Sequence, residues 1–282
     1  MEFFVRGDRF ATYRYADGAV PGFTAFYTYG DRSLTQPASN GLALWLEHDN
    51  IIRQATPNNR QPTTINHENT KPRNHETSFP PPETLDLTFR RGTYSAGFEQ
   101  VCLWRDAVGE KVLTETRTAR VVPGPSEGAI LDLRFVLEAP QETGITFGKT
   151  EQAFLCVRAA PSLFSTEAFT FGGGQMRNSL GSYGAADIHG RQANWCACVG
   201  VVEGETVGFA LLEHPGNPFF PSPWRAQPDG LISPSPFGWR SLDLVAGAKL
   251  TLRYRLHVHV GYVNQGWADA RLADFAHESG SL

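Results

Sequence analysis

Residues 252–260 alternate between apolar side chains and side chains that are cationic or titratable. The two sets are Tyr254, Leu256, Val258 and Val260, and Arg253, Arg255, His257 and His259. Because successive side chains of a β-strand point to opposite faces, the pattern predicts a strand with one core face and one polar face. The four cationic or titratable side chains are costly to bury unless each is paired with a carboxylate or hydrogen-bonded. They therefore favour an open groove that receives carboxylates, sugar hydroxyls or phosphates. A solvated sheet face with acidic neighbours is the alternative.

The same period of two recurs at residues 84–90, 111–122, 130–137 and 206–212. In the first and third of these runs the apolar side consists of Leu85, Leu87 and Phe89, and of Leu131, Leu133, Phe135 and Leu137. Residues 196–212 predict a hairpin that turns at Glu203-Gly204, where a reversal needs glycine. One helix is expected at 265–277, after a possible Asn264 cap. Together these features predict an all-β fold, a large antiparallel β-sandwich with a short C-terminal helix.

Composition limits the partners of the chain. Its 282 residues, with 28 glycines and 19 prolines, fit one sandwich domain over 1–282. A net charge of −4 without a basic run disfavours nucleic acid, and no apolar stretch is long enough to span a membrane. The four cysteines lack disulfide or zinc spacing, which predicts reduced core thiols. Reduced cysteines and an N-terminus that does not resemble a signal peptide together predict a cytoplasmic protein. A homo-oligomer remains open.

Residues 53–82 interrupt the strand pattern with a long polar segment. Such a segment is usually either functional or disordered, so a lid or binding loop and a disordered surface loop are both open. The tripeptide Asn-His-Glu occurs in it twice, and supplies His67, Glu68, His75 and Glu76 as candidates.

Two further groups of residues have the chemistry of a sugar site. The first runs from Asp187 through His189 and Arg191 to Trp195, and the second comprises His214, Asn217, Trp224 and Arg225 in a proline-rich loop. Tryptophan offers a flat apolar face to a sugar ring, and arginine offers directional hydrogen bonds. For Trp195 a place in the core is an equal alternative, and His214 could instead cap a strand end.

The sequence offers several candidates for a catalytic acid and base and does not select a pair among them. They are His48, Glu68, Glu76, Glu151 and His214. A glycosidase needs two carboxylates across a groove, whereas an epimerase or lyase needs one base and one acid. No zinc-type spacing of histidine and cysteine is present, so we expect neither a metal nor a cofactor.

Short motifs spread in order over the chain resemble a bacterial family often labelled PmoA-like. They are Tyr13-Arg14-Tyr15, Gly148-Lys149-Thr150-Glu151, Asn178-Ser179-Leu180-Gly181, Gly190-Arg191 with Trp195, Gly208-Phe209-Ala210, His214-Pro215, Pro221 with Trp224, Gly230-Leu231, Pro236-Phe237, Leu252-Arg253-Tyr254-Arg255, His259 and Gly261. The resemblance implies a β-sandwich similar to galactose mutarotases and a role in carbohydrate metabolism.

The chain departs from that family at one block. Where the family usually has His-Pro-His-His-Arg-Gly before Leu-Trp, this chain has residues 38–43, and only Trp45 and His48 of the block are kept. The expected function is therefore a carbohydrate-active enzyme, foremost a glycoside hydrolase, with a small saccharide as its ligand. A sugar epimerase, isomerase or lyase is the close variant, and the arginines favour an anionic substrate. A non-catalytic sugar-binding protein is the third possibility, and the missing histidines support it.

Overall fold

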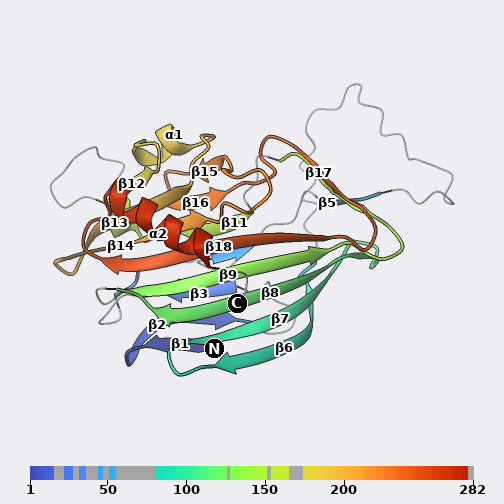
Figure 1. Cartoon of the computed structure of the whole chain (residues 1–282), viewed down its shortest axis with the longest axis horizontal. Helices are drawn as coiled ribbons and strands as arrows, with labels where there is room; N and C mark the ends of the chain where they lie inside the picture. Colours follow the sequence, from blue (N-terminus) through green and yellow to red (C-terminus); the bar gives the residue numbers. More distant parts are fainter. Residues whose placement is uncertain are drawn as a thin grey trace.

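The computed structural model describes residues 1–15, 22–27, 32–35, 44–46, 51–54, 80–125, 128–150, 154–164 and 174–278. Within these ranges the chain forms two large antiparallel sheets, a small third sheet, two helices and one short 3-10 helix at Pro161–Leu163 (Figure 1). The helices are α1 (Gly184–Ile188) and α2 (Gln265–His277). No helix in the described part of the chain is long and apolar enough to cross a membrane.

The largest sheet has eight strands. They are β6 (Glu83–Arg91), β7 (Ala96–Arg105), β8 (Lys111–Pro123), β9 (Ala129–Glu138), β12 (Gln175–Asn178), β13 (Trp195–Val202), β14 (Glu205–Glu213) and β18 (Lys249–Val260). Their order across the sheet is β12-β13-β14-β18-β9-β8-β7-β6. β18 therefore lies in the middle of the sheet, between β14 and β9, and β6 forms one edge.

The second large sheet and the small sheet are built from shorter strands. The second sheet contains β1 (Glu2–Val5), β2 (Asp8–Arg14), β3 (Gly22–Phe26), β4 (Leu44–Leu46), β11 (Leu155–Arg158), β16 (Leu231–Pro234) and β15 (Trp224–Ala226), in that order across the sheet. The small sheet has the order β17 (Leu242–Leu244), β10 (Ile145–Phe147) and β5 (Ile51–Arg53).

The two large sheets pack face to face through aromatic side chains. The rings of Tyr13 on β2 and Phe98 on β7 have centroids 4.3 Å apart, and Phe3 on β1 lies 6.2 Å from Phe98. One cluster of buried hydrophobic residues takes members from both sheets. These contacts confirm the predicted all-β sandwich with antiparallel sheets.

A pair of charged residues is buried inside this sandwich. Arg117 and Glu115 on β8 form an ion pair at 2.7 Å, and Glu115 also accepts a hydrogen bond from the Trp104 indole at 2.8 Å. Burial raises the pKa of the neighbouring Tyr13 hydroxyl to about 12, although Arg117 acts in the opposite direction. Because the two charges are paired and hydrogen-bonded, the interior can hold them. The sequence pattern did not single out this pair.

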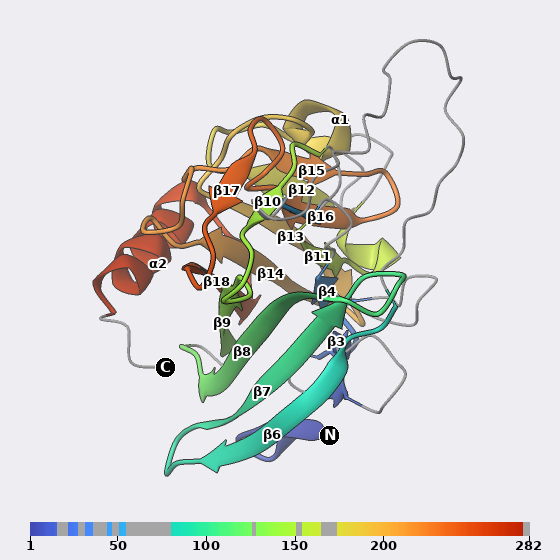
Figure 2. The same cartoon turned by 90° about the vertical axis from the view of Figure 1, so that its right-hand side faces the viewer.

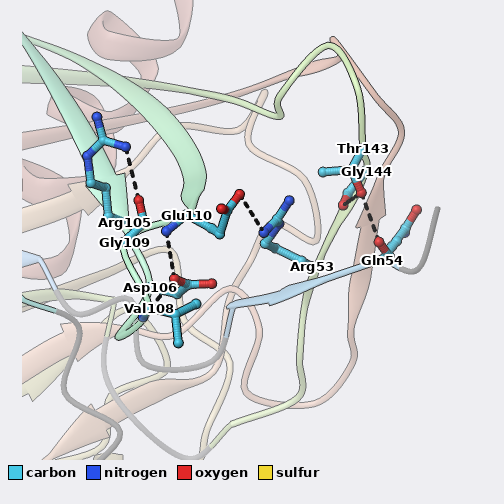
Figure 3. A network of polar contacts seen from close by, with 9 residues as sticks. All are labelled: Arg53, Gln54, Arg105, Asp106, Val108, Gly109, Glu110, Thr143 and Gly144. Carbon is cyan, nitrogen blue, oxygen red and sulfur yellow. Dashed lines mark hydrogen bonds and ion pairs between the residues drawn. The ribbon is translucent and has the colours of Figure 1, made fainter. Parts of the chain in front are cut away.

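A network of polar contacts fixes the small sheet to the turn between β7 and β8 (Figure 3). The Asp106 carboxylate accepts a hydrogen bond from the backbone N–H of Glu110 at 2.9 Å, which closes the turn. The Glu110 carboxylate in turn lies 3.4 Å from Arg53 on β5. The Thr143 hydroxyl, just before β10, donates to the carbonyl of Gln54 at 2.8 Å. These contacts hold β5 and β10 in place although they are only three residues long.

The local sequence predictions for strands hold with one exception. The inward residues of β9, which are Leu131, Leu133, Phe135 and Leu137, are all buried, and the hairpin β13–β14 turns at Glu203 and Gly204, both with positive φ. Strand β6 differs, because Leu85 is 53% and Phe89 54% exposed. β6 is an edge strand with a bulge between Thr84 and Asp86, so Leu85 and Phe89 were wrongly predicted to be core, whereas Leu87 is half-buried and packs against the core. The four cysteines are buried and free, as predicted.

The C-terminal helix has the predicted bounds and cap. The Asn264 side chain accepts a hydrogen bond from the backbone N–H of Trp267 at 2.8 Å, and Ala268, Leu272 and Phe275 are the buried residues of the helix. The short α1 and the 3-10 helix were not predicted. Each has five residues or fewer and gives no periodic signal in the sequence.

Replacing Asn264 by alanine should lower the free energy of unfolding by about 1 kcal/mol, since it removes the N-cap hydrogen bond. Urea denaturation followed by circular dichroism measures this change. Asn264→Ser keeps a capping oxygen and serves as the control, with little loss expected. An equal loss in both variants would contradict a capping role.

Candidate functional site

The polar face of β18 is covered by helix α2, so the open groove predicted along it is not present between Arg255 and His259. Arg255, His257 and His259 are 3%, 1% and 4% exposed. The Trp267 ring of α2 lies 4.8 Å from the ring of His257 and 5.2 Å from that of His259. Figure 1 shows α2 lying across β18 and β14. These three residues are consequently unavailable to a substrate in this structure.

The charge of Arg255 is neutralised by two carboxylates. Its guanidinium makes two hydrogen bonds to Asp132 on β9, at 2.5 and 3.0 Å, and a third to Glu278 after α2, at 2.6 Å. The Phe275 ring also packs 4.6 Å from the guanidinium. Asp132 is the cross-strand neighbour of Arg255, so it is the acidic partner that a buried arginine requires.

The two histidines of this face are held in their neutral form. Burial lowers the pKa of His257 to about 3, with contributions from His259, Arg271 and Arg255, and lowers that of His259 to about 4. Neither ring nitrogen of His257 has a hydrogen-bond partner among the described residues. Their chemistry is that of buried aromatic rings under a helix rather than of acid and base groups.

Trp195 belongs to the same covered face and is not a sugar platform. Its side chain is fully buried, and its indole N–H donates to Asp269 of α2 at 2.8 Å. It packs in a cluster with Ala268, Leu272 and Phe275. The alternative that Trp195 is a core residue is therefore correct.

His214 and Asn217 also have structural partners. His214 accepts a hydrogen bond from the backbone N–H of Gly216 at 2.8 Å, and its ring lies 4.9 Å from Phe275. The Asn217 side-chain amide makes two hydrogen bonds to the backbone of Arg253. Its nitrogen donates to the Arg253 carbonyl at 2.9 Å, and its oxygen accepts from the Arg253 N–H at 2.8 Å. Both side chains are 5% exposed. They attach the proline-rich loop to β18 rather than facing a ligand.

A buried carboxylate anchors the next part of that loop. Glu213 accepts hydrogen bonds from the Ser222 backbone N–H at 2.8 Å and from the Ser222 hydroxyl at 2.6 Å. Burial raises its pKa to about 7, although the bonds from Ser222 act in the opposite direction. Ser222 is directly followed by Pro223, Trp224 and Arg225, so this anchor positions the start of β15.

A surface pocket of about 290 Å³ lies where four chain segments meet. It is lined by Lys149, His189, Gly190, Pro223, Trp224, Arg225, Ser235, Gly238 and Trp239. These come from the segment after β10, the turn after α1, the start of β15 and the segment after β16. The volume is at the lower limit of small-molecule sites, which usually span about 300–1,000 Å³.

Hydrogen bonds and close packing hold the walls of the pocket in place. The Trp224 side chain is 1% exposed and donates its indole N–H to the Ala193 carbonyl at 2.6 Å. The backbone N–H of Gly190 donates to the Trp224 carbonyl at 2.8 Å. Gly238 packs so closely that a Cβ there would lie 2.9 Å from the ring of Pro223. A side chain at position 238 would therefore disturb the pocket wall.

The lining combines cations with an exposed aromatic ring. Lys149, His189 and Arg225 contribute cationic or titratable groups, and no carboxylate is among the described lining residues. Trp239 is 50% exposed. The Ser235 residue is 6% exposed, and its hydroxyl, which is buried, has no hydrogen-bond partner among the described residues. A buried hydroxyl of this kind can be satisfied by a polar ligand group.

His189 has one ring nitrogen oriented by the backbone. Its Nδ1 lies 3.2 Å from the Ala226 carbonyl oxygen. Because a carbonyl oxygen only accepts hydrogen bonds, Nδ1 must carry the proton in this contact, and in the neutral ring Nε2 is left as an acceptor. Such an imidazole can act as a general base.

Two of the predicted site residues lie at this pocket: Arg225 lines it, whereas Trp224 forms part of its wall with a buried ring and is not a sugar platform. Arg191 is exposed and adjacent, since its carbonyl accepts a hydrogen bond from the Trp224 backbone N–H at 2.9 Å. Six further candidates lie outside the described residues: His48, His67, Glu68, His75, Glu76 and Glu151. No group of three metal-ligating side chains occurs among the described residues.

Among the polar and aromatic lining residues, three were not predicted from the sequence as parts of a site: Lys149, Ser235 and Trp239. His189 belongs to the group from Asp187 to Trp195 that was singled out in the sequence, and Lys149 lies in the Gly-Lys-Thr-Glu motif. Trp239 follows Pro236-Phe237-Gly238, where proline and glycine are turn signals, and the Gly238 backbone N–H donates to the Ser235 carbonyl at 2.9 Å.

Comparison with known proteins identifies the family but not the activity. No curated protein matches the sequence. Residues 2–273 match a family described as a family of unknown function, DUF6807. The resemblance to PmoA-like proteins therefore stays a prediction. Since the match covers nearly all of the sequence, the chain belongs to the DUF6807 family.

Proposed function

We propose that the protein is a carbohydrate-active enzyme that takes an anionic saccharide, a uronic acid or its oligomer, in the pocket around Trp239 and Arg225. The observation that carries the proposal is the lining itself, with cationic groups, an exposed tryptophan and no described carboxylate. The motifs resembling PmoA-like proteins support a sugar as ligand. The buried free cysteines support a cytoplasmic location.

Each part of the lining has a role toward such a ligand. The Trp239 ring offers an apolar face to the sugar, and the Ser235 hydroxyl offers a hydrogen bond that no described residue takes. Arg225 and Lys149 offer charge-assisted hydrogen bonds to a carboxylate. A neutral sugar would leave these cations without a partner in the site.

The proposed chemistry is that of a lyase or epimerase. Either reaction begins when a base removes the proton from the carbon next to the sugar carboxylate, and His189 Nε2 is the base candidate. Negative charge develops on the carboxylate in this step, where Arg225 and Lys149 stabilise it. Glycoside hydrolysis needs two carboxylates about 5–9.5 Å apart, and the described lining supplies neither. Glu151, two residues after Lys149, is the candidate on which the hydrolase alternative depends.

Calorimetry with glucuronate, galacturonate and the neutral sugars glucose and galactose tests the ligand class. We expect the uronates to bind more tightly, and Arg225→Ala to weaken them about 10- to 100-fold, since it removes a charge-assisted hydrogen bond. Trp239→Ala should weaken uronates and neutral sugars alike, by about tenfold. Lys111→Ala, an exposed cation at the start of β8, is the control.

Incubation with oligouronides distinguishes the reactions. In a lyase, the electron pair left by the proton forms a conjugated carbon–carbon double bond as the bond from the next carbon to the glycosidic oxygen breaks, and that oxygen leaves and takes up a proton. In an epimerase, a proton returns to the same carbon from the opposite face without cleavage. A hydrolase adds water across the glycosidic bond and releases a new reducing end without a double bond. His189→Gln should abolish the first two. Binding without turnover would favour the non-catalytic alternative, and equal affinity for uronates and neutral sugars would contradict the proposed pocket.

A further inference from the structure

Strand β6 is an edge strand that exposes apolar side chains. It has nine residues and ends the eight-stranded sheet, with β7 as its neighbour among the described strands. Leu85 and Phe89 are each more than half exposed. Figure 2 shows β6 along the outer border of the sheet. The opposite edge differs, because Arg177 of β12 forms a bridge with Tyr183. Long edges of this kind pair readily with another strand.

The regular part of β6 has two different faces. After the bulge, Leu87 and Phe89 pair with Gln100 and Phe98 of β7, whose side chains point into the sandwich. The Phe89 ring lies 6.1 Å from that of Tyr15, in an edge-to-face arrangement. Leu87 and Phe89 therefore extend the hydrophobic core toward the edge of the sheet. At the edge, no described residue covers the Phe89 ring.

The charges of β6 are arranged with opposite signs at its two ends. Glu83 and Asp86 lie in the first half of the strand, and Arg90 and Arg91 in the second. Two copies of such a strand, placed antiparallel, set the acidic half of each against the basic half of the other. This arrangement is self-complementary, as a twofold interface requires.

We propose that β6 pairs with β6 of a second copy of this chain, antiparallel about a twofold axis at Thr88, and joins the two large sheets into one. In this register Asp86 of each copy stands opposite Arg90 of the other on the outer face. Leu87 stands opposite Phe89 on the inner face. The pairing covers the exposed Phe89 ring and satisfies the backbone groups of the edge.

The pairing is independent of the pocket around Trp239, which is built from other segments. It also uses only the part of β6 that follows the bulge, so the alternation of faces is regular through the interface. A shift by one residue would place apolar side chains opposite charged ones, and a shift by two residues would separate Asp86 from Arg90, so this register is favoured over both.

Sedimentation velocity of the full chain over a range of concentrations tests the proposal. We expect a reversible dimer. Asp86→Arg and Arg90→Asp should each weaken it about tenfold or more, because each places like charges opposite one another twice in the interface. The double variant Asp86→Arg/Arg90→Asp exchanges the two charges and should restore the wild-type dissociation constant.

Two controls accompany these variants. Lys111→Glu reverses an exposed charge on β8 and should leave the dimer unchanged, and thermal unfolding checks that every variant is folded. A wild-type chain that stays monomeric at all concentrations would overturn the proposal. So would a dimer that neither single variant weakens, or one that the double variant fails to restore.

Discussion

Asp132→Ala is expected to lower the free energy of unfolding by about 3–5 kcal/mol, because it leaves the Arg255 guanidinium buried without its main partner. Asp132 is 1% exposed and makes two hydrogen bonds to Arg255. Glu278 keeps one contact with Arg255, but its side chain is 53% exposed and lies beyond the end of α2. Urea denaturation measures the loss. We also expect α2 to become more susceptible to proteolysis.

The same two strands offer a matched control. Lys249 and Glu138 pair across β18 and β9 at 3.1 Å, and both are partly exposed. Glu138→Ala should therefore cost no more than about 1 kcal/mol. The double variant Asp132→Leu/Arg255→Met, which removes both buried charges, should recover much of the stability lost by Asp132→Ala. A loss for Asp132→Ala as small as that for Glu138→Ala would show that Arg255 finds water or another partner.

Acidification from pH 6.5 to 5 is expected to destabilise the fold by about 2–3 kcal/mol per pH unit near pH 5.5. Burial lowers the pKa of His214 and His259 to about 4 and that of His257 to about 3. The unfolded chain binds protons at these histidines below about pH 6.5, whereas the folded chain does not. The contribution of these three histidines to stability is therefore complete above pH 6.5 and is lost as the pH falls toward the folded values.

Glu213 has the opposite effect on the pH dependence of stability, between about pH 4.5 and 7. Burial raises its pKa to about 7, so its contribution to stability is present below the unfolded value of about 4.5 and is lost as the pH rises through 7. One proton bound by folded Glu213 offsets one of the three protons bound by the unfolded histidines. The net difference of about two protons gives the expected slope, since each proton corresponds to about 1.4 kcal/mol per pH unit.

Two variants separate these opposing contributions. His257→Phe should reduce the slope by about 1 kcal/mol per pH unit, because a phenyl ring keeps the contact with Trp267 and binds no proton. Glu213→Gln should increase the slope by a similar amount. The measurement is the urea midpoint as a function of pH. A slope that neither variant changes would mean that other groups control the acid sensitivity.

The sequence by itself determined the features that depend on neighbours along the chain. The alternation in β9 and β18 predicted which side chains face the core, and Glu203-Gly204 predicted the hairpin turn. The bounds and cap of α2 followed from Asn264 and the spacing of its apolar residues. Pleating, turn conformation and capping each involve only a few successive residues, so the local pattern is enough.

Only the tertiary structure decided what covers each face and which segments meet. The polar side of β18 was expected to be an open groove, yet α2 lies on it and Asp132, more than a hundred residues away, pairs with Arg255. Leu85 and Phe89 of β6 were expected in the core, yet β6 lies at the sheet edge and exposes both. The pocket joins Lys149, His189 and Trp239 from three distant segments. Strand order and helix placement are set by long-range packing, and the period of a strand carries no information about the partner that its face will meet.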